Sequence, residues 1–151
     1  MMLLCRHAMC FLVFVTAAFA LSPALAGDPF PFGSELMLDA APMHGSKRIP
    51  MLEIEDDGSA SIDLWCTSLH GRATVTADSI AIVPGAVATD EPAPPCDADH
   101  SASDAALLAE LAQVTTWRRD GDRIDLSGTA AAAGSGAPTG TIPLHYRLMT
   151  N

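Results

Sequence analysis

The chain has 151 residues, a length typical of one domain, and its 18 acidic residues outnumber its 8 lysines and arginines to give a formal net charge of −10. That charge argues against a protein that binds nucleic-acid phosphates or an anionic membrane surface. Solubility explains the acidity more simply than an acidic docking face does.

Residues 1–26 have the pattern of a secretory signal peptide. Arg6 precedes an apolar run from Phe11 to Leu21, and Ala24-Leu25-Ala26 places small residues where a signal peptidase reads them. The run is too short to span about 30 Å of hydrocarbon comfortably, so a membrane anchor is the weaker interpretation. No cysteine follows the small residues, which argues against a lipoprotein. We predict cleavage after residue 26, one domain over 27–151, no transmembrane segment after cleavage, and a periplasmic or secreted location in a bacterial envelope.

Two cysteines, Cys66 and Cys96, remain in the predicted mature chain, because Cys5 and Cys10 leave with the signal peptide. An even pair in an exported protein is typical of a disulfide, and a free thiol or half of a metal site is the alternative. Cys96 and His100 form a Cys-x3-His pattern, which falls short of the three or four ligands of a zinc site. We therefore expect no metal and no cofactor.

The first half of the mature chain is predicted to consist of strands joined by tight turns. Ile62 and Leu64 alternate with polar neighbours, which is the period of a half-buried strand. Asp57-Gly58 supplies the positive-φ geometry of a tight turn, so residues 51–64 form a hairpin. A turn-rich break follows, which holds Cys66 and has Gly71 near its end. The predicted strands are Glu35–Leu38, Met51–Glu55, Ser61–Leu64, Arg72–Thr76 and Ser79–Val83.

After a Pro-rich loop over 84–95, the hydrophobic period becomes that of a helix. We predict a helix from Ser103 to Thr115, capped by Ser101 or Ser103. Asp104 would then lie in the first turn, where a carboxylate meets the positive end of the helix dipole. Four apolar side chains fall on one face of this helix, namely Leu107, Leu108, Leu111 and Val114.

The last third of the chain returns to extended structure. Residues 116–119 and 123–127 flank an Asp-Gly-Asp turn and predict a third hairpin. The Ala, Gly and Ser stretch over 128–140 is expected to be a mobile loop, because it cannot bury enough apolar surface to order itself. A final strand covers 142–149, and Pro143 near its start predicts an edge position.

These elements together predict a mainly β (α+β) fold with six to eight short strands and one late helix. An antiparallel sheet curled into a partial barrel, with the helix covering or plugging it, would bury the strand faces and the helix leucines.

The order of these parts resembles the META domain, the family of the heat-inducible HslJ-like proteins. The resemblance covers about residues 34–149. It rests on Gly58, Cys66, Gly71, Cys96, the helix with its apolar spacing, Asp122 with Leu126, and the strand Leu144–Leu148. It implies a cracked, conical β-barrel with one packed helix. It also implies roles linked to stress response and secretion, and no enzymatic activity defines the family.

This chain departs from the family pattern at several positions. Trp65 and Thr67 flank Cys66 where the family usually has Gly and Asn, and Pro94-Pro95 precedes the second cysteine instead of Met-Ala. Asp104 stands where a glutamate would start the helix, and the family's early tryptophan is missing. The chain is therefore similar to a divergent member of the family.

No catalytic constellation is visible in the sequence. His44, His70, His100 and His145 are scattered, and no Gly-x-Ser-x-Gly turn is present. A hydrolase is therefore the weakest hypothesis, and we expect no catalytic residues.

Trp65 and Trp117 are the candidate residues for a ligand or partner surface. Trp65 adjoins Cys66, and a tryptophan there more often packs on a disulfide than serves as a ligand platform. Trp117 with Arg118 and Arg119 forms a basic patch too small for nucleic acid. We expect a non-enzymatic envelope protein that binds a partner protein or serves in the stress response. The alternative is a carrier of a small hydrophobic ligand, with Trp65 at the mouth of a barrel cavity.

Overall fold

The computed structural model describes residues 28–87, 96–129 and 140–149. The predicted signal peptide, residues 88–95 of the Pro-rich loop and residues 130–139 of the Ala/Gly stretch lie outside the described residues. The described part holds eight strands and one helix. They are β1 (Leu36–Leu38), β2 (Met51–Ile54), β3 (Ser59–Asp63), β4 (Ser68–Val75), β5 (Ile80–Val87), α1 (Ala98–Leu111), β6 (Val114–Asp120), β7 (Arg123–Thr129) and β8 (Thr141–Leu148).

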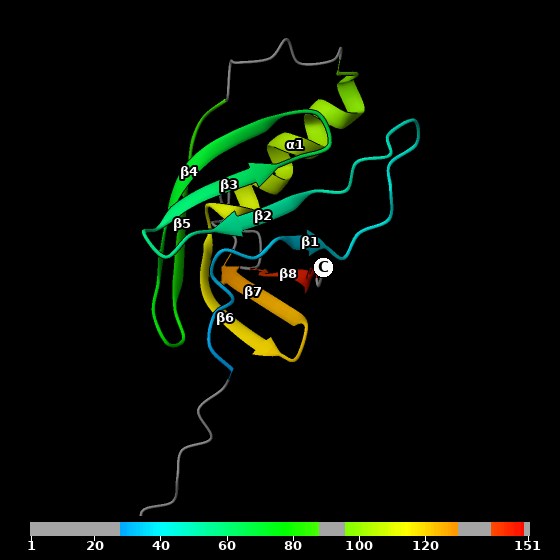
Figure 1. Cartoon of the computed structure of the whole chain (residues 1–151). Coiled ribbons are helices and arrows are strands. Elements are labelled where there is room, and N and C mark those ends of the chain that lie inside the picture. Colours follow the sequence, from blue (N-terminus) through cyan, green and yellow to red (C-terminus); the bar gives the residue numbers. More distant parts are fainter. Residues whose placement is uncertain (1–27, 88–95, 130–139, 150–151) are drawn as a thin grey trace, which may run out of the picture.

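All eight strands belong to one antiparallel sheet with the order β5-β4-β3-β2-β1-β8-β7-β6 (Figure 1). Strands β2 to β5 form one meander and β6 to β8 form another. The three-residue strand β1 joins them, because Leu36 pairs with Leu52 of β2 on one side and with Leu148 of β8 on the other. The predicted mainly β, curled antiparallel sheet with one helix is confirmed.

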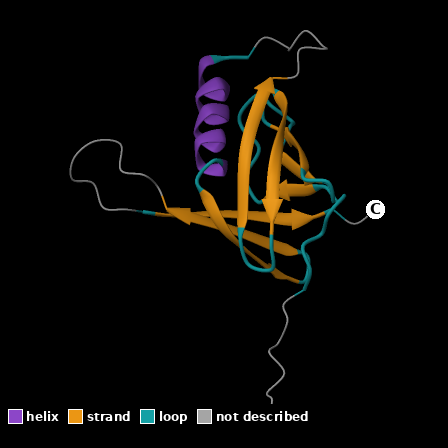
Figure 2. Cartoon of the chain, turned by 90° about the vertical axis from the view of Figure 1, so that its left-hand side faces the viewer, coloured by secondary structure: helices purple, strands orange, loops and turns teal. Residues whose placement is uncertain are grey.

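The two outer strands of the sheet meet at one end of the molecule. An isolated bridge joins Ser79, just before β5, to Thr116 of β6. Trp117 adds two bonds across the same gap, since its backbone N–H donates to Asp78 O at 3.3 Å and its indole N–H donates to Thr76 O at 2.9 Å. Figure 2 shows α1 lying alongside the long strands.

The concave side of the sheet is filled by alternating strand residues. In β2 and β7 every second side chain is buried, which is the predicted period of two. Tyr146 of β8 is 1% exposed among them, and this burial raises the pKa of its phenol. Each aliphatic side chain buried in this way contributes about 1.5–3 kcal/mol. The core leucines and isoleucines with no more than 2% exposure, from the strands, the segment after β3 and α1, include Leu36, Leu52, Ile54, Ile62, Leu64, Leu69, Leu111, Ile124 and Leu126.

Helix α1 begins earlier than the sequence pattern predicted. Its N-cap is Asp97, whose carboxylate accepts the N–H of His100 at 2.9 Å, so the predicted start at Ser103 is wrong. Ser103 lies inside the helix, and its hydroxyl donates to Asp99 O. The helix ends at Leu111 rather than Thr115, because Val114 already pairs with Gly128 as the first residue of β6.

Two glycines allow strands to approach closely. Gly71 lies within β4, so the predicted break shrinks to the few residues before Ser68. A Cβ at Gly71 would lie 2.6 Å from Val83 O of β5. Gly128 belongs to β7 rather than to the predicted loop, and a Cβ there would lie 2.0 Å from Gln113 O. Both positions therefore need glycine for lack of space.

The prediction that Pro143 marks an edge strand is wrong, because β8 lies between β1 and β7. The physical reason is the shortness of β1, which pairs only with Tyr146 to Leu148. Around Pro143, β8 therefore has a strand partner on one side only, opposite Ser127 of β7, and a missing N–H is tolerated there as it is at an edge.

Candidate functional site

Residues 65–67, the short segment between β3 and β4 that we call the strap, are bound by a buried carboxylate of α1. Asp104 is 5% exposed. Its Oδ1 accepts the backbone N–H of Trp65 at 3.0 Å, and its Oδ2 accepts the N–H groups of Cys66 and Thr67 at 3.2 Å each. The Thr67 hydroxyl donates a fourth bond at 3.1 Å. Burying this carboxylate is therefore compensated by hydrogen bonds rather than by a cation.

A disulfide joins the strap to the start of the helix a second time. Cys66 and Cys96 are bonded with a Cα–Cα distance of 5.7 Å, in the ordinary range, so the predicted pairing is confirmed. Both sulfurs and a carboxylate oxygen of Asp104 lie within 4.8 Å of one another. With the sulfurs bonded to each other and the carboxylate occupied, this cluster offers no thiolate to a metal.

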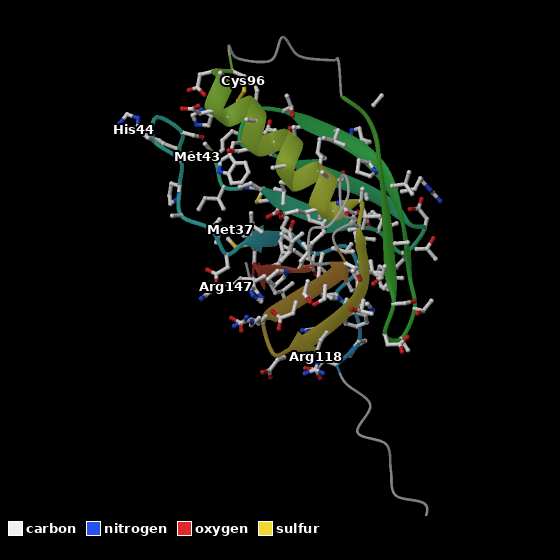
Figure 3. The ribbon with its side chains drawn as sticks, turned by 180° about the vertical axis from the view of Figure 1, so that it is seen from behind. Met37, Met43, His44, Cys96, Arg118 and Arg147 are labelled. Atoms are coloured by element: carbon white, nitrogen blue, oxygen red, sulfur yellow. A yellow bond between two sulfur atoms is a disulfide. The ribbon has the colours of Figure 1, made fainter. Side chains whose placement is uncertain are left out.

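A cavity of about 270 Å³ lies between the strap, the start of α1 and the loop before β2, and we call it the strap pocket. Figure 3 shows Cys96 at the start of the helix, with Met43 and His44 of that loop at the same end of the molecule. The lining residues are Gly45, Ser46, Lys47, Arg48, Trp65, Cys66, Asp97 and His100.

His100 is held in the strap pocket by the N-cap residue of its own helix. His100 as a whole is 7% exposed, and its Nδ1 lies 2.7 Å from Asp97 Oδ1. Asp97 accepts hydrogen bonds from the backbone N–H of His100 and from its ring. These bonds lower the pKa of the Asp97 carboxyl, the backbone bond more than the ring bond. His100 Nε2 and Trp65 Nε1 are both buried without a hydrogen-bond partner within the part of the chain that the structure describes.

A second hollow, the β6 groove, lies at the junction where the outer strands meet. It has a volume of about 490 Å³. Trp117 in its wall packs edge-on against Phe30, with ring centroids 5.1 Å apart. Arg118 is exposed, and no hydrogen bond or ion pair ties it to another described residue. The groove is lined by Asp28, Ala77, Asp78, Thr116, Trp117, Arg118, Arg119, Asp125 and Ser127.

Asp125 at the rim of the β6 groove belongs to a small charged cluster. Its Oδ1 accepts from Arg123 Nε at 2.7 Å and lies 2.6 Å from His145 Nδ1. Partial burial raises the pKa of Asp125, but the hydrogen bonds from Arg123 and His145 outweigh burial and leave this pKa below its usual value. The cluster joins the side chains of β7 and β8 beside the groove.

The structure places the predicted surface residues apart. Trp65 lines the strap pocket and Trp117 the β6 groove, and Figure 3 shows Cys96 and Arg118 at opposite ends of the molecule. Trp65 also packs against the core, in agreement with the packing interpretation. The histidines stay scattered. His70 faces the Ser61 hydroxyl at 3.4 Å, and no described carboxylate completes that pair.

The sequence interpretation missed the roles of Asp104 and His100. Asp104 was assigned to the first helical turn, whereas it lies in the helix interior and binds the strap. The signal was present in the spacing, because the buried helix residues His100, Asp104, Leu107 and Leu111 follow at intervals of four, three and four. A polar residue in register with a buried apolar stripe indicates a satisfied internal contact.

Comparison with known proteins assigns most of the described chain to one family. A family model described as the META domain matches residues 34–135. No curated protein and no solved structure matches the chain. Within the described residues, no helix has the length and apolar character needed to cross a membrane.

Proposed function

Because the chain belongs to the META domain family, we propose that it is an exported, non-enzymatic envelope protein that binds a partner protein through the β6 groove. The family points to a stress-related envelope role. The observation that carries the proposal is the groove itself, a hollow of about 490 Å³ beside an aromatic residue and an exposed arginine. Aromatic and arginine side chains are the ones enriched at protein interfaces.

The partner would meet the groove largely from the side of β6. Trp117 is held in place by its bond to Thr76 O and by Phe30, so the wall is rigid before binding. Arg118 brings a positive charge to a chain whose formal charge is −10, and the lining of the groove also includes Arg119 and the carboxylates of Asp28, Asp78 and Asp125. A partner with alternating charges would fit this lining better than a uniformly charged one.

The alternative, a carrier of a hydrophobic ligand inside the barrel, is the weaker proposal. The side chains that would line an internal cavity contact one another in a single buried cluster, with Tyr146 at 1% exposure among them. A ligand there would have to displace close-packed side chains, which costs more than filling a preformed pocket.

Arg118→Glu tests the binding proposal, with Arg147→Glu as the matched control. Arg147 is also an exposed arginine, on β8 outside the groove, where it pairs with Asp39 at 3.5 Å. A partner protein captured from envelope extract by the wild-type chain should no longer be captured by the Arg118→Glu variant and should still be captured by the Arg147→Glu variant. Equal recovery of every captured protein by both variants would remove the groove as an interaction face.

Export is tested separately by the mature N-terminus. Full-length protein expressed in a Gram-negative host should appear in the periplasmic fraction, begin at Gly27 and carry no free thiol after unfolding without reductant. Unprocessed protein with reduced Cys66 in the cytoplasmic fraction would refute export.

A further inference from the structure

The methionines of the described chain lie outside its hydrophobic core, although methionine is among the residues most often buried. The buried cluster of the described residues contains no methionine, and none is among the half-buried side chains that pack against it. Met37, Met43 and Met51 are half-buried, and Met149 is 41% exposed. These are all the methionines of the predicted mature chain, so core packing explains none of them.

Met37 and Met51 lie opposite each other on the outer face of the sheet. Their neighbours Leu36 and Leu52 are fully buried, and side chains alternate along a strand, so the two methionines face away from the core. On its other side Met37 is in register with Arg147 of β8 (Figure 3). Both methionines line a hollow of about 280 Å³, which we call the methionine groove, together with Lys47, Arg48, Ile49 and Asp63. A small solute can therefore reach both side chains without any opening of the core.

The sulfur chemistry of the chain makes these thioethers its most readily oxidised sulfurs. Thiolates react with oxidants first where they are present, but Cys66 and Cys96 are bonded to each other. Hypochlorous acid transfers its chlorine to a thioether sulfur and releases hydroxide. Water then adds to the sulfur, chloride leaves and two protons are released. Sulfur loses two electrons and chlorine gains them, so the net products are one sulfoxide, one chloride ion and one proton.

The positions of the methionines allow the fold to tolerate this product. A sulfoxide is polar and disrupts a packed core, but a half-buried or exposed side chain keeps its sulfoxide in contact with water. In the methionine groove, Lys47 is exposed, and no hydrogen bond or ion pair ties it to another described residue. Its ammonium can donate to a sulfoxide oxygen, which further favours the oxidised form there.

We propose that Met37, Met43, Met51 and Met149 form a scavenging surface for hypohalous acids. Each thioether consumes one molecule of oxidant while the chain stays folded. The reaction is stoichiometric, and renewal of the surface requires a methionine sulfoxide reductase. This activity is independent of the β6 groove, and either can fail without the other.

The consumption of hypochlorous acid provides the first test. The mature protein with its disulfide intact is mixed with the oxidant, and the remaining oxidising equivalents are counted with thionitrobenzoate. This reagent also reports chloramines formed on amino groups, so only oxidant that has oxidised the protein disappears. The wild type should consume one equivalent per methionine. The variant with all four methionines replaced by leucine, a volume-conserving change, should leave nearly all of the oxidant.

The location of the added oxygen provides the second test, with Leu52→Met as the matched control. Leu52 adjoins Met51 but is 0% exposed, so the introduced thioether faces the core. Peptide mass spectrometry should find oxygen on Met37 and Met51 and none on the introduced methionine. Leu126→Met, at another fully buried position, repeats the control. The Tm of the oxidised wild type should lie within about 5 °C of that of the reduced protein.

Each result decides the proposal. Equal consumption by the variant without methionines would assign the reaction to other side chains and overturn the scavenging surface. Oxidation of the introduced core methionine as fast as Met51 would overturn the role of exposure. Met37 and Met51 left unoxidised would overturn the role of the methionine groove. A Tm lowered by more than about 10 °C would overturn the claim that the fold survives oxidation.

Discussion

Replacing Asp104 with asparagine tests how the helix is held to the sheet. Asparagine keeps the size of the side chain but turns one oxygen into an N–H donor. In the better orientation its oxygen takes the place of Oδ2, which accepts from Cys66 and Thr67. The amide then points N–H groups at the Trp65 N–H, which bonds Oδ1 at 3.0 Å in the wild type.

The magnitude follows from these four contacts. One backbone donor left unsatisfied costs about 1–3 kcal/mol, and three bonds reduced from charged to neutral strength cost roughly 0.5–1 kcal/mol each. The neutral amide is easier to bury, which lowers this sum and places the expected loss at about 2–5 kcal/mol of unfolding free energy. For a chain of this size that lowers Tm by about 5–20 °C.

The assay is thermal and urea unfolding with the disulfide intact, and Asp99→Asn is the matched control. Asp99 is an exposed aspartate in the first turn of the same helix, so its replacement should cost less than about 1 kcal/mol. A loss for Asp104→Asn no larger than that of the control would refute the reasoning, since the strap N–H groups would then be satisfied by water.

Three further predictions concern the covalent link, a strand contact and the charged cluster. Replacing both Cys66 and Cys96 with serine opens a loop with a sequence separation of 30, so the free energy of unfolding should fall by about 3–4 kcal/mol. Reductant should lower the Tm of the wild type to that of the variant and leave the Tm of the variant unchanged. Gly128→Ala should cost more than about 2 kcal/mol, because its Cβ would lie 2.0 Å from Gln113 O, whereas Gly140→Ala, with open space around it, should be neutral; equal melting curves would contradict this. The pKa of Asp125 is lowered in the folded state, so its ion pair adds to the free energy of unfolding at neutral pH and stops doing so as pH falls through that pKa. Asp125→Asn should therefore cost about 0.5–1 kcal/mol at pH 7 and nothing in acid, and a stability loss that does not change with pH would contradict the pairing.

The strand pattern was predictable because its causes are local. Alternation in residues 51–54 and 123–127 reports the buried face directly, and the glycines at 58 and 121 both have positive φ in tight turns. Errors arose where a distant element decides the outcome. Pro143 was assigned to an edge by a local rule, but its tolerance depends on where β1 ends.

The candidate sites were less predictable than the fold. Trp65 and Trp117 were identified by residue type, but the residues that contact them are distant in the sequence. Trp117, for example, donates a hydrogen bond to Thr76 O, 41 residues earlier. The start of α1 could have been predicted, since an aspartate three residues before His100 is an N-cap signal. That stretch was considered for a metal instead, because Cys96 and His100 share it.

The shortness of β1 has a consequence for the order of folding. Each meander pairs strands that are close in sequence, whereas β1 must bring Leu36 to Leu148 from opposite ends of the described chain. Closing so long a loop costs conformational entropy that the few pairs of β1 repay poorly until the rest of the sheet exists. We therefore expect the meanders to form first and the pairing of β1 with β8, which we call the β1 seam, to form after the transition state. Leu36→Ala should then speed unfolding and leave the refolding rate nearly unchanged in stopped-flow experiments. A slower refolding rate of matching size would instead place the seam in the transition state.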